Sequence, residues 1–158
     1  MSAKERIEKS LRLEKVVENT VTLEWWGMYK YEFAGLDYRN AMFNDGQVIA
    51  EIWGDINPVI ADLKDIKISG LAIEENRKNF KLDAVEIIKK LGDSVCLFGN
   101  VDSVNTIMSG NMCDIRKEID KQSKARKYGN FIFQNGSPIA PGTSKENILE
   151  MVNYARRV

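Results

Sequence analysis

The sequence predicts an α/β fold, a reduced parallel barrel built from five β/α units. Strand-like apolar runs alternate with helical patterns along most of the chain, which is typical of a parallel sheet with helical crossovers. These runs are short and nearly all apolar, as in strands that are covered on both faces. The chain has 158 residues, whereas an eight-unit barrel takes roughly 250. The alternative is an open five-stranded parallel sheet that pairs as a dimer, because uncovered sheet edges favour association.

Turn and helix-capping signals along the sequence predict the order of the strands and helices. Strands are expected at residues 20–25, 47–52, 68–73, 94–98 and 130–133. Helices are expected up to about residue 13, then at 57–65, 83–91, from 103, at 112–127 and at 147–156. Asn57 is predicted as an N-cap with Pro58 at the first helical position. Thr143 with Glu146 fits a capping box, and Met112, Ile115 and Ile119 form a predicted apolar stripe.

The composition excludes several classes of function. Lys plus Arg and Asp plus Glu number 23 each, so no basic surface favours a nucleic acid or an anionic membrane. No apolar run approaches the roughly 20 residues of a membrane span, and the polar first 13 residues do not resemble a signal peptide. The two cysteines, Cys96 and Cys113, lack metal-type spacing. We expect reduced thiols in a cytoplasmic protein, with Cys96 in the core.

The chain contains no histidine, which limits the chemistry available to it. Ser-His-Asp and Cys-His sites cannot be built within the chain, and the usual zinc sites that contain histidine cannot be built either. A general acid or base would have to be a carboxylate, Lys, Tyr or Cys. No metal or cofactor is predicted.

Two carboxylates near the carboxyl ends of predicted strands are candidate acids or bases. In parallel α/β folds ligands gather at this rim. Asp102 is either a rim carboxylate or the N-cap of the helix from Ser103. Glu51 is either an inward, buried carboxylate with a raised pKa or an outward or paired one.

Other rim residues are candidate ligand contacts. Trp25 and Trp53 are placed to stack on a flat ligand, or alternatively to plug the interior of a small barrel. Asn135, Gly136 and Ser137 are placed to present backbone N–H groups to an anion, with a plain strand-to-helix turn as the alternative. Asn100 is either a ligand contact or a turn former.

Four stretches carry a resemblance to a known family. They are residues 2–38 (SAKERIEKSLRLEK … WWGMYKYEFAGLDY), 48–73 (VIAEIWGDINPVIADLKDIKISGLAI), 91–102 (LGDSVCLFGNVD) and 129–154 (GNFIFQNGSPIAPGTSKENILEMVNY). In this order they resemble the uroporphyrinogen decarboxylase superfamily, which includes methyltransferases that serve corrinoid proteins. The resemblance implies a TIM-like barrel in a single domain over residues 1–158. Residues 1–45 would correspond to the parent's first unit and residues 46–158 to its last four.

The departures from the family pattern bear on function. The chain passes from the parent's first unit to its fifth, so the region that carries the decarboxylases' catalytic Asp is absent, and the first loop has no Arg. The zinc-ligand positions of the methyltransferases correspond to Glu51, Trp53 and Ser137. The resemblance therefore implies a non-catalytic binding or regulatory protein, a pseudoenzyme, near tetrapyrrole or corrinoid methyl-transfer metabolism.

Two alternatives remain open. One is a partner-dependent methyltransferase or decarboxylase acting on a tetrapyrrole or a methylated small molecule. The other is a structural subunit of a full-length homologue. The expected partners are a tetrapyrrole or corrinoid ligand, a corrinoid protein, or further copies of the chain.

Overall fold

The computed structural model describes residues 9, 49–63, 65, 68–76 and 79–158. The predicted strand at residues 20–25, Trp25 and all of the first predicted helix except residue 9 lie outside the described residues. The five-unit count and the placement of Trp25 therefore stay predictions.

The described strands form one parallel sheet. Its order is β1 (Ile49–Ile52), β2 (Gly70–Ile73), β3 (Cys96–Phe98) and β4 (Phe131–Ile132), with every neighbouring pair parallel. The α/β class and the parallel arrangement predicted from the sequence are thus confirmed for four strands. Strand order follows chain order because each crossover returns the chain to the adjacent position in the sheet.

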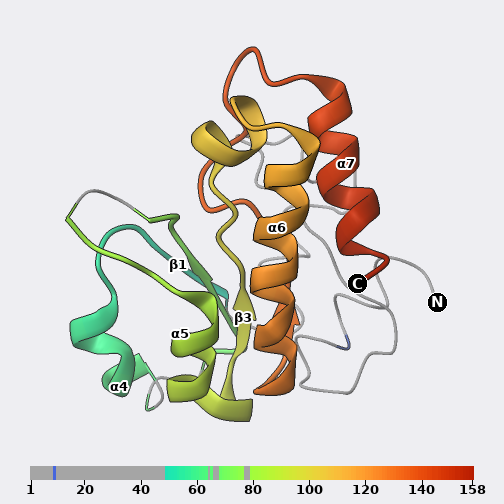
Figure 1. Ribbon diagram of the computed structural model, residues 1–158. Coiled ribbons are helices and arrows are strands. Elements are labelled where there is room, and N and C mark those ends of the chain that lie inside the picture. Colours follow the sequence, from blue (N-terminus) through green and yellow to red (C-terminus); the bar gives the residue numbers. More distant parts are fainter. Residues whose placement is uncertain (1–8, 10–48, 64, 66–67, 77–78) are drawn as a thin grey trace, which may run out of the picture.

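Helices cover one face of this sheet (Figure 1). The described helical segments are a 3-10 turn at Asn57–Val59, α4 (Ile60–Leu63), α5 (Ala84–Leu91), a π-helical segment at Ser103–Met108, α6 (Met112–Ser123) with a 3-10 extension at Lys124–Lys127, and α7 (Lys145–Ala155). In Figure 1, α5 and α6 lie in front of the strands, α4 lies beside α5, and α7 packs beside α6. None of the helices within the described ranges is long and apolar enough to cross a membrane.

The sheet separates two apolar clusters because successive strand side chains point to opposite faces. On the helix side, Leu71, Leu97 and Phe133 pack in the large core with the buried faces of α5 and α6. On the other side, a smaller cluster contains Ala72, Cys96, Phe98 and Ile132, of which Cys96 and Ile132 are fully buried.

Three local predictions are wrong in detail. Ile56 occupies the N-cap position before Pro58, because Asp55 Oδ1 accepts a 3.0 Å hydrogen bond from the Asn57 backbone N and sets the turn. Ser144, one residue after the predicted cap, caps α7, because Thr143 donates its hydroxyl to the Ala140 carbonyl. Met112 does not join the apolar stripe and stays 47% exposed, because it lies at the very start of α6.

Candidate functional site

The carboxyl ends of the four strands meet at one rim, as the sequence predicted. The rim is extended by a parallel bridge between Val101 and Asn135, just beyond β3 and β4. A shallow hollow opens in it, lined by Glu51, Ile52, Trp53, Ala72, Ile73, Glu74, Gln134 and Gly136. The hollow is too shallow to enclose a water molecule, so a ligand could only lie against it.

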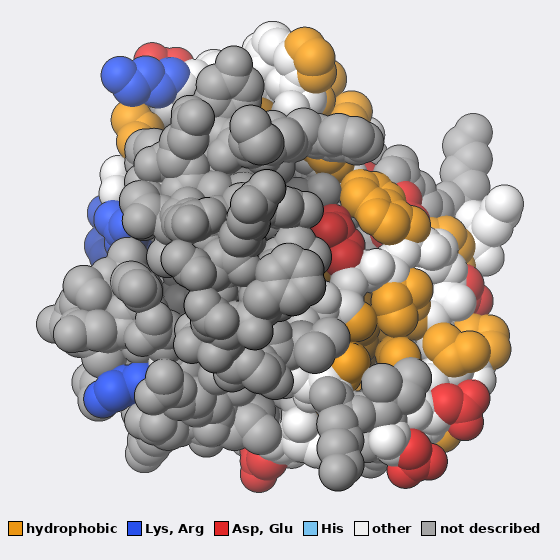
Figure 2. Space-filling model, turned by 180° about the vertical axis from the view of Figure 1, so that it is seen from behind, with side chains coloured by type: hydrophobic (Ala, Val, Ile, Leu, Met, Phe, Trp, Pro, Cys, Tyr) orange, Lys and Arg blue, Asp and Glu red, His pale blue; other side chains and the backbone are white. Residues whose placement is uncertain are grey.

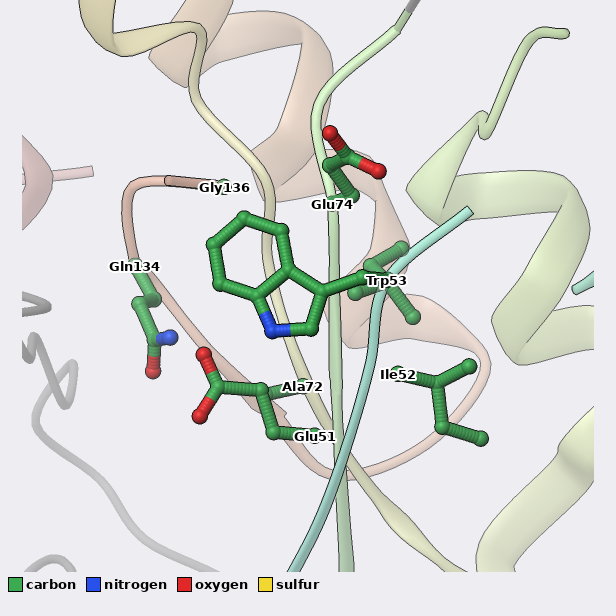
Figure 3. Close-up of a pocket in the computed structure, with 8 residues that line it drawn as sticks. Glu51, Ile52, Trp53, Ala72, Glu74, Gln134 and Gly136 are labelled. Atoms are coloured by element: carbon green, nitrogen blue, oxygen red, sulfur yellow. The ribbon is translucent and has the colours of Figure 1, made fainter. Parts of the chain in front are cut away.

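Trp53 dominates the hollow. In Figure 3 its indole lies among the carboxylates of Glu51 and Glu74 and the amide of Gln134. Trp53 directly follows β1, and half of its side chain (50%) is exposed. The exposed half of Trp53 is available for contact with another molecule, and its role as a ligand contact stays a prediction.

Glu74 shapes the turn that carries Trp53. Its Oε2 accepts a 2.8 Å hydrogen bond from the backbone N of Gly54, the residue after Trp53. Gly54 has φ 103°, a conformation that side chains beyond glycine rarely adopt. The buried carboxylate and the glycine together hold the chain in the bend that presents the indole.

Glu51 is an exposed carboxylate, not a buried one. It lies on the face of β1 turned away from the helices, and β1 is an outer strand of the described sheet. The prediction of a buried carboxylate is therefore wrong for Glu51, which is exposed although it lies on the face of the sheet opposite the helices.

Asp102 lies at the start of the π-helical segment as its N-cap. Its Oδ1 accepts hydrogen bonds from the backbone N of Val104 (2.9 Å) and of Asn105 (2.7 Å), and its Oδ2 accepts one from the Asn105 amide (2.8 Å). This arrangement matches the structural alternative stated above. Asp102 does not line the hollow.

Asn100 is buried and bridges two loops. Its Nδ2 donates to the Glu74 carbonyl at 3.0 Å and to the Leu82 carbonyl at 2.7 Å. Both amide hydrogens are thereby used within the protein. Asn100 holds the loop after β2 against the loop after β3, so its reach toward a ligand is limited.

The segment 135–137 forms a closed turn. The Gly136 N–H donates to the Val101 carbonyl at 2.9 Å, the Asn135 amide donates to the Ser137 carbonyl at 2.7 Å, and the Ser137 hydroxyl donates to Glu75 Oε1 at 2.6 Å. The Gly136 N–H is therefore committed, and the plain-turn alternative describes the segment better than an anion cradle. A Cβ on Gly136 would lie 2.4 Å from the Glu75 backbone N, which explains the glycine.

Two polar residues that line the hollow, Glu74 and Gln134, were not among the candidates named from the sequence. The strand register places Glu51, Ala72, Phe98 and Ile132 side by side across the sheet. Trp53, Glu74 and Gln134 each follow one of these residues by two positions, so they lie side by side one step further along the strands. Counting every second residue onward from each predicted strand would have identified Glu74 and Gln134, since alternate residues of a strand share a face.

The residues at the family's zinc positions do not fit a zinc ion. The Trp53 indole has no acceptor lone pair for a metal, and the Ser137 hydroxyl is engaged with Glu75. Across the described ranges, no cluster of three or more His, Cys, Asp or Glu side chains could hold a metal ion. Cys96 is buried in the smaller apolar cluster, and burial raises the pKa of its thiol to about 12.

The comparisons with known proteins show the family of the chain. The family model described as "Uroporphyrinogen decarboxylase (URO-D)" matches residues 36–158. The chain is 33% identical over 104 residues to the methylcobamide:CoM methyltransferase MtaA of Methanosarcina barkeri, covering 66% of this chain and 29% of the relative. It is 31% identical over 94 residues to a uroporphyrinogen decarboxylase of Rickettsia rickettsii (strain Sheila Smith), covering 60% of this chain and 25% of the relative.

A solved methyltransferase from Methanosarcina mazei superposes with a TM-score of 0.61 at 27% identity. It covers 75% of this chain, and this chain covers 33% of it. The chain therefore belongs to the uroporphyrinogen decarboxylase family. It spans about a third or less of the length of the relatives that it matches.

Proposed function

We propose that this chain is a non-catalytic, binding or regulatory member of the family, whose rim hollow holds a corrinoid or related tetrapyrrole. The observation that carries the proposal is the half-exposed Trp53 indole at the carboxyl rim of a parallel sheet. This edge is where ligands of parallel α/β folds gather, and an exposed aromatic face binds flat conjugated molecules by stacking.

The fate of the other candidates supports binding over catalysis. Asp102 is the N-cap of a helical segment, and the Ser137 hydroxyl donates a hydrogen bond to Glu75. The zinc positions lack suitable ligands, so the methyl-transfer chemistry of the longer relatives has no equivalent donor set here. What remains at the hollow is a stacking surface with polar groups around it.

The charge of the hollow favours one kind of tetrapyrrole. Its charged lining residues are Glu51 and Glu74, and no Lys or Arg belongs to the lining within the described residues. Carboxylate-rich porphyrins would be repelled by these acids, whereas a corrinoid presents neutral amides that can donate hydrogen bonds to them. We therefore expect cobalamins to bind more tightly than uroporphyrin or coproporphyrin.

Equilibrium dialysis with absorbance detection tests this proposal. Cobalamins, uroporphyrin and coproporphyrin are titrated against the wild type, Trp53→Ala and Trp53→Phe. Loss of stacking worth about 0.5–1.5 kcal/mol should weaken cobalamin binding roughly two- to tenfold in Trp53→Ala, with partial recovery in Trp53→Phe.

A matched control is Tyr128→Ala, because Tyr128 is also a large exposed aromatic residue, at 43%, and lies outside the hollow. The affinity of the Tyr128→Ala variant for cobalamins should equal that of the wild type. The proposal is contradicted if no tetrapyrrole of the panel shows saturable binding, or if Trp53→Ala and Tyr128→Ala lose the same affinity.

A partner-dependent enzyme is the second candidate, and Glu51 is the observation that favours it. Its carboxylate is exposed at the hollow, where it could exchange a proton with a bound molecule. This candidate requires activity in a mixture with a partner protein, and Glu51→Gln should abolish it. An unchanged rate in that variant would remove Glu51 from any catalytic role.

A further inference from the structure

The Trp53 indole is not fixed in place by side-chain packing alone. Half of its side chain is exposed, so protein contacts hold the ring on one side only. Figure 2 looks at the face of the sheet away from the helices, where exposed hydrophobic side chains lie next to acidic groups. On such a surface, the direction of a side chain depends on how firmly the backbone beneath it is held. For Trp53 that backbone is the turn at Gly54, whose N–H donates to Glu74 Oε2 at 2.8 Å.

The position of Glu74 is fixed in turn by Asn100. The Nδ2 group of Asn100 donates to the backbone carbonyl of Glu74 at 3.0 Å and to that of Leu82 at 2.7 Å. Asn100 is only 6% exposed, and it lies 26 residues after Glu74 along the chain, in the loop after β3. A continuous path of hydrogen bonds therefore runs from the loop after β3, through Glu74, to the residue that follows Trp53.

A second buried amide orients the amide of Asn100. Gln122 on α6 is 2% exposed, and its Nε2 donates to the Asn100 oxygen at 3.4 Å and to Glu118 Oε1 at 2.9 Å. Because an ionised Glu118 can only accept, the nitrogen of Gln122 faces it, and this nitrogen then meets the oxygen of Asn100. The Asn100 nitrogen is thereby turned toward the two carbonyls. Gly99 makes room for the contact, since a Cβ there would lie 2.6 Å from the Gln122 oxygen.

The buried Gln122 amide is unfavourable for stability. Within the described part of the chain, its oxygen has no hydrogen-bond partner, although it is shielded from water. Leaving a buried oxygen in this state costs free energy, and an apolar side chain of similar length, such as Met, would avoid that cost. The amide of Gln122 is therefore explained better by what it positions than by what it contributes to the core.

We propose that Asn100 is a positioning residue for the rim hollow, fixing through Glu74 the turn that presents the Trp53 indole. Gln122 holds the Asn100 amide in the orientation that this requires. Asn100 does not line the hollow, so its effect reaches a ligand only through the turn. A turn that is already held in its binding conformation loses less freedom when a ligand binds, which raises affinity. The proposal rests on the binding role proposed for Trp53 above.

Tryptophan fluorescence without ligand tests the positioning itself. The chain has three tryptophans, so Trp53 is the remaining one in a Trp25→Phe/Trp26→Phe background. Adding Asn100→Ala to this background should increase the quenching of Trp53 by acrylamide and lower its fluorescence anisotropy. Both changes are expected because the turn loses the support of Glu74 and becomes more mobile.

A matched control separates positioning from a general loss of stability. Asn147 also donates through Nδ2 to two backbone carbonyls, those of Ile107 at 2.8 Å and Gly110 at 3.0 Å, but it joins α7 to the segment before α6. Asn147→Ala should lower the denaturation midpoint, as Asn100→Ala does, and should leave the quenching and anisotropy of Trp53 unchanged.

Gln122→Met provides a readout that a merely structural role would not give. Its denaturation midpoint should stay at the wild-type value, because the unpartnered Gln122 oxygen is removed while the Asn100 oxygen loses a donor. The quenching of Trp53 should still rise in this variant. The rise should be smaller than in Asn100→Ala, because the bond from Gln122 is longer than the two bonds to the carbonyls.

Equilibrium dialysis with cobalamins, in the chain that keeps Trp25 and Trp26, measures the consequence for binding. Asn100→Ala should bind roughly two- to fivefold more weakly than the wild type, and Asn147→Ala should bind equally well. Unchanged Trp53 quenching in Asn100→Ala, or equal changes in Asn100→Ala and Asn147→Ala, would overturn the proposal. Because the fluorescence experiment uses no ligand, its result is independent of whether a tetrapyrrole binds.

Discussion

At the scale of single residues, side chains that the sequence suggests as ligand contacts instead hold the loops of the rim together. Asn100 bridges two loops through both of its amide hydrogens, and Ser137 ties the last loop to Glu75. Buried polar groups need such partners, because an unmade hydrogen bond costs about 1–3 kcal/mol. A polar residue at the end of a strand is therefore explained as well by its hydrogen bonds to neighbouring loops as by ligand binding.

The two cysteines should differ sharply in reactivity and in their effect on stability. Cys96 is buried with its pKa raised to about 12, whereas Cys113 is exposed at the start of α6. Between the ordinary value of 9.0 and about 12, the unfolded chain loses the Cys96 proton and the folded chain keeps it. The free energy of unfolding should therefore fall as pH rises through this window, by up to about 1.4 kcal/mol per pH unit.

Urea denaturation at several pH values, comparing the wild type with Cys96→Ala, isolates this contribution. The stability difference between the two proteins should shrink above pH 9.0, and it should be independent of pH below that value.

An aromatic disulfide reagent should modify one thiol in the native protein and two after denaturation. Two reactive thiols in the native protein would contradict the burial of Cys96.

At the scale of elements, local hydrogen bonds decide where each helix begins. Asp83 caps α5 through the backbone N of Val85 and Glu86, and Asn111 forms a capping box with Asp114 at α6. The start of α5 was predicted correctly, but the caps near Asn57 and Thr143 were displaced by one residue. A neighbouring oxygen, in Asp55 or in the Ala140 carbonyl, took over the competing hydrogen bond.

The N-cap at Asp102 gives a test that separates a structural from an electrostatic role. Asp102→Ala should lower the free energy of unfolding by about 1 kcal/mol, because two backbone N–H groups lose their acceptor. Asp102→Asn should cost only a few tenths, because Asn is an equally good N-cap. Guanidinium denaturation measures both, and an equal loss in the two variants would show that the charge, not the cap, is what matters.

At the scale of the whole molecule, the sheet is protected unevenly. β3 lies between β2 and β4, and all three of its residues are buried, whereas β1 is an outer strand of the described sheet with alternating exposure. Stability of this kind is local, since exposed edges open at a lower free energy than central strands.

Amide hydrogen exchange should follow this gradient. The Leu97 amide, bonded to the Asn130 carbonyl at 2.9 Å, should exchange near the rate of global unfolding, and the amides of β1 should exchange much faster. Faster exchange in β3 than in β1 would contradict the described sheet order.

The α/β class, the parallel strands, the rim and the family could all be read from the chain alone. They depend on the alternation of apolar runs with helical patterns and on the order of four stretches, which are local or sequential signals. The roles of Glu51, Asn100 and Gly136 could not be read in this way. Whether Glu51 is buried depends on which strands flank β1, and the use of the Asn100 amide and the Gly136 N–H depends on loops distant along the chain. Only the tertiary structure brings those loops together, because burial and hydrogen-bond partners are properties of packing rather than of sequence pattern.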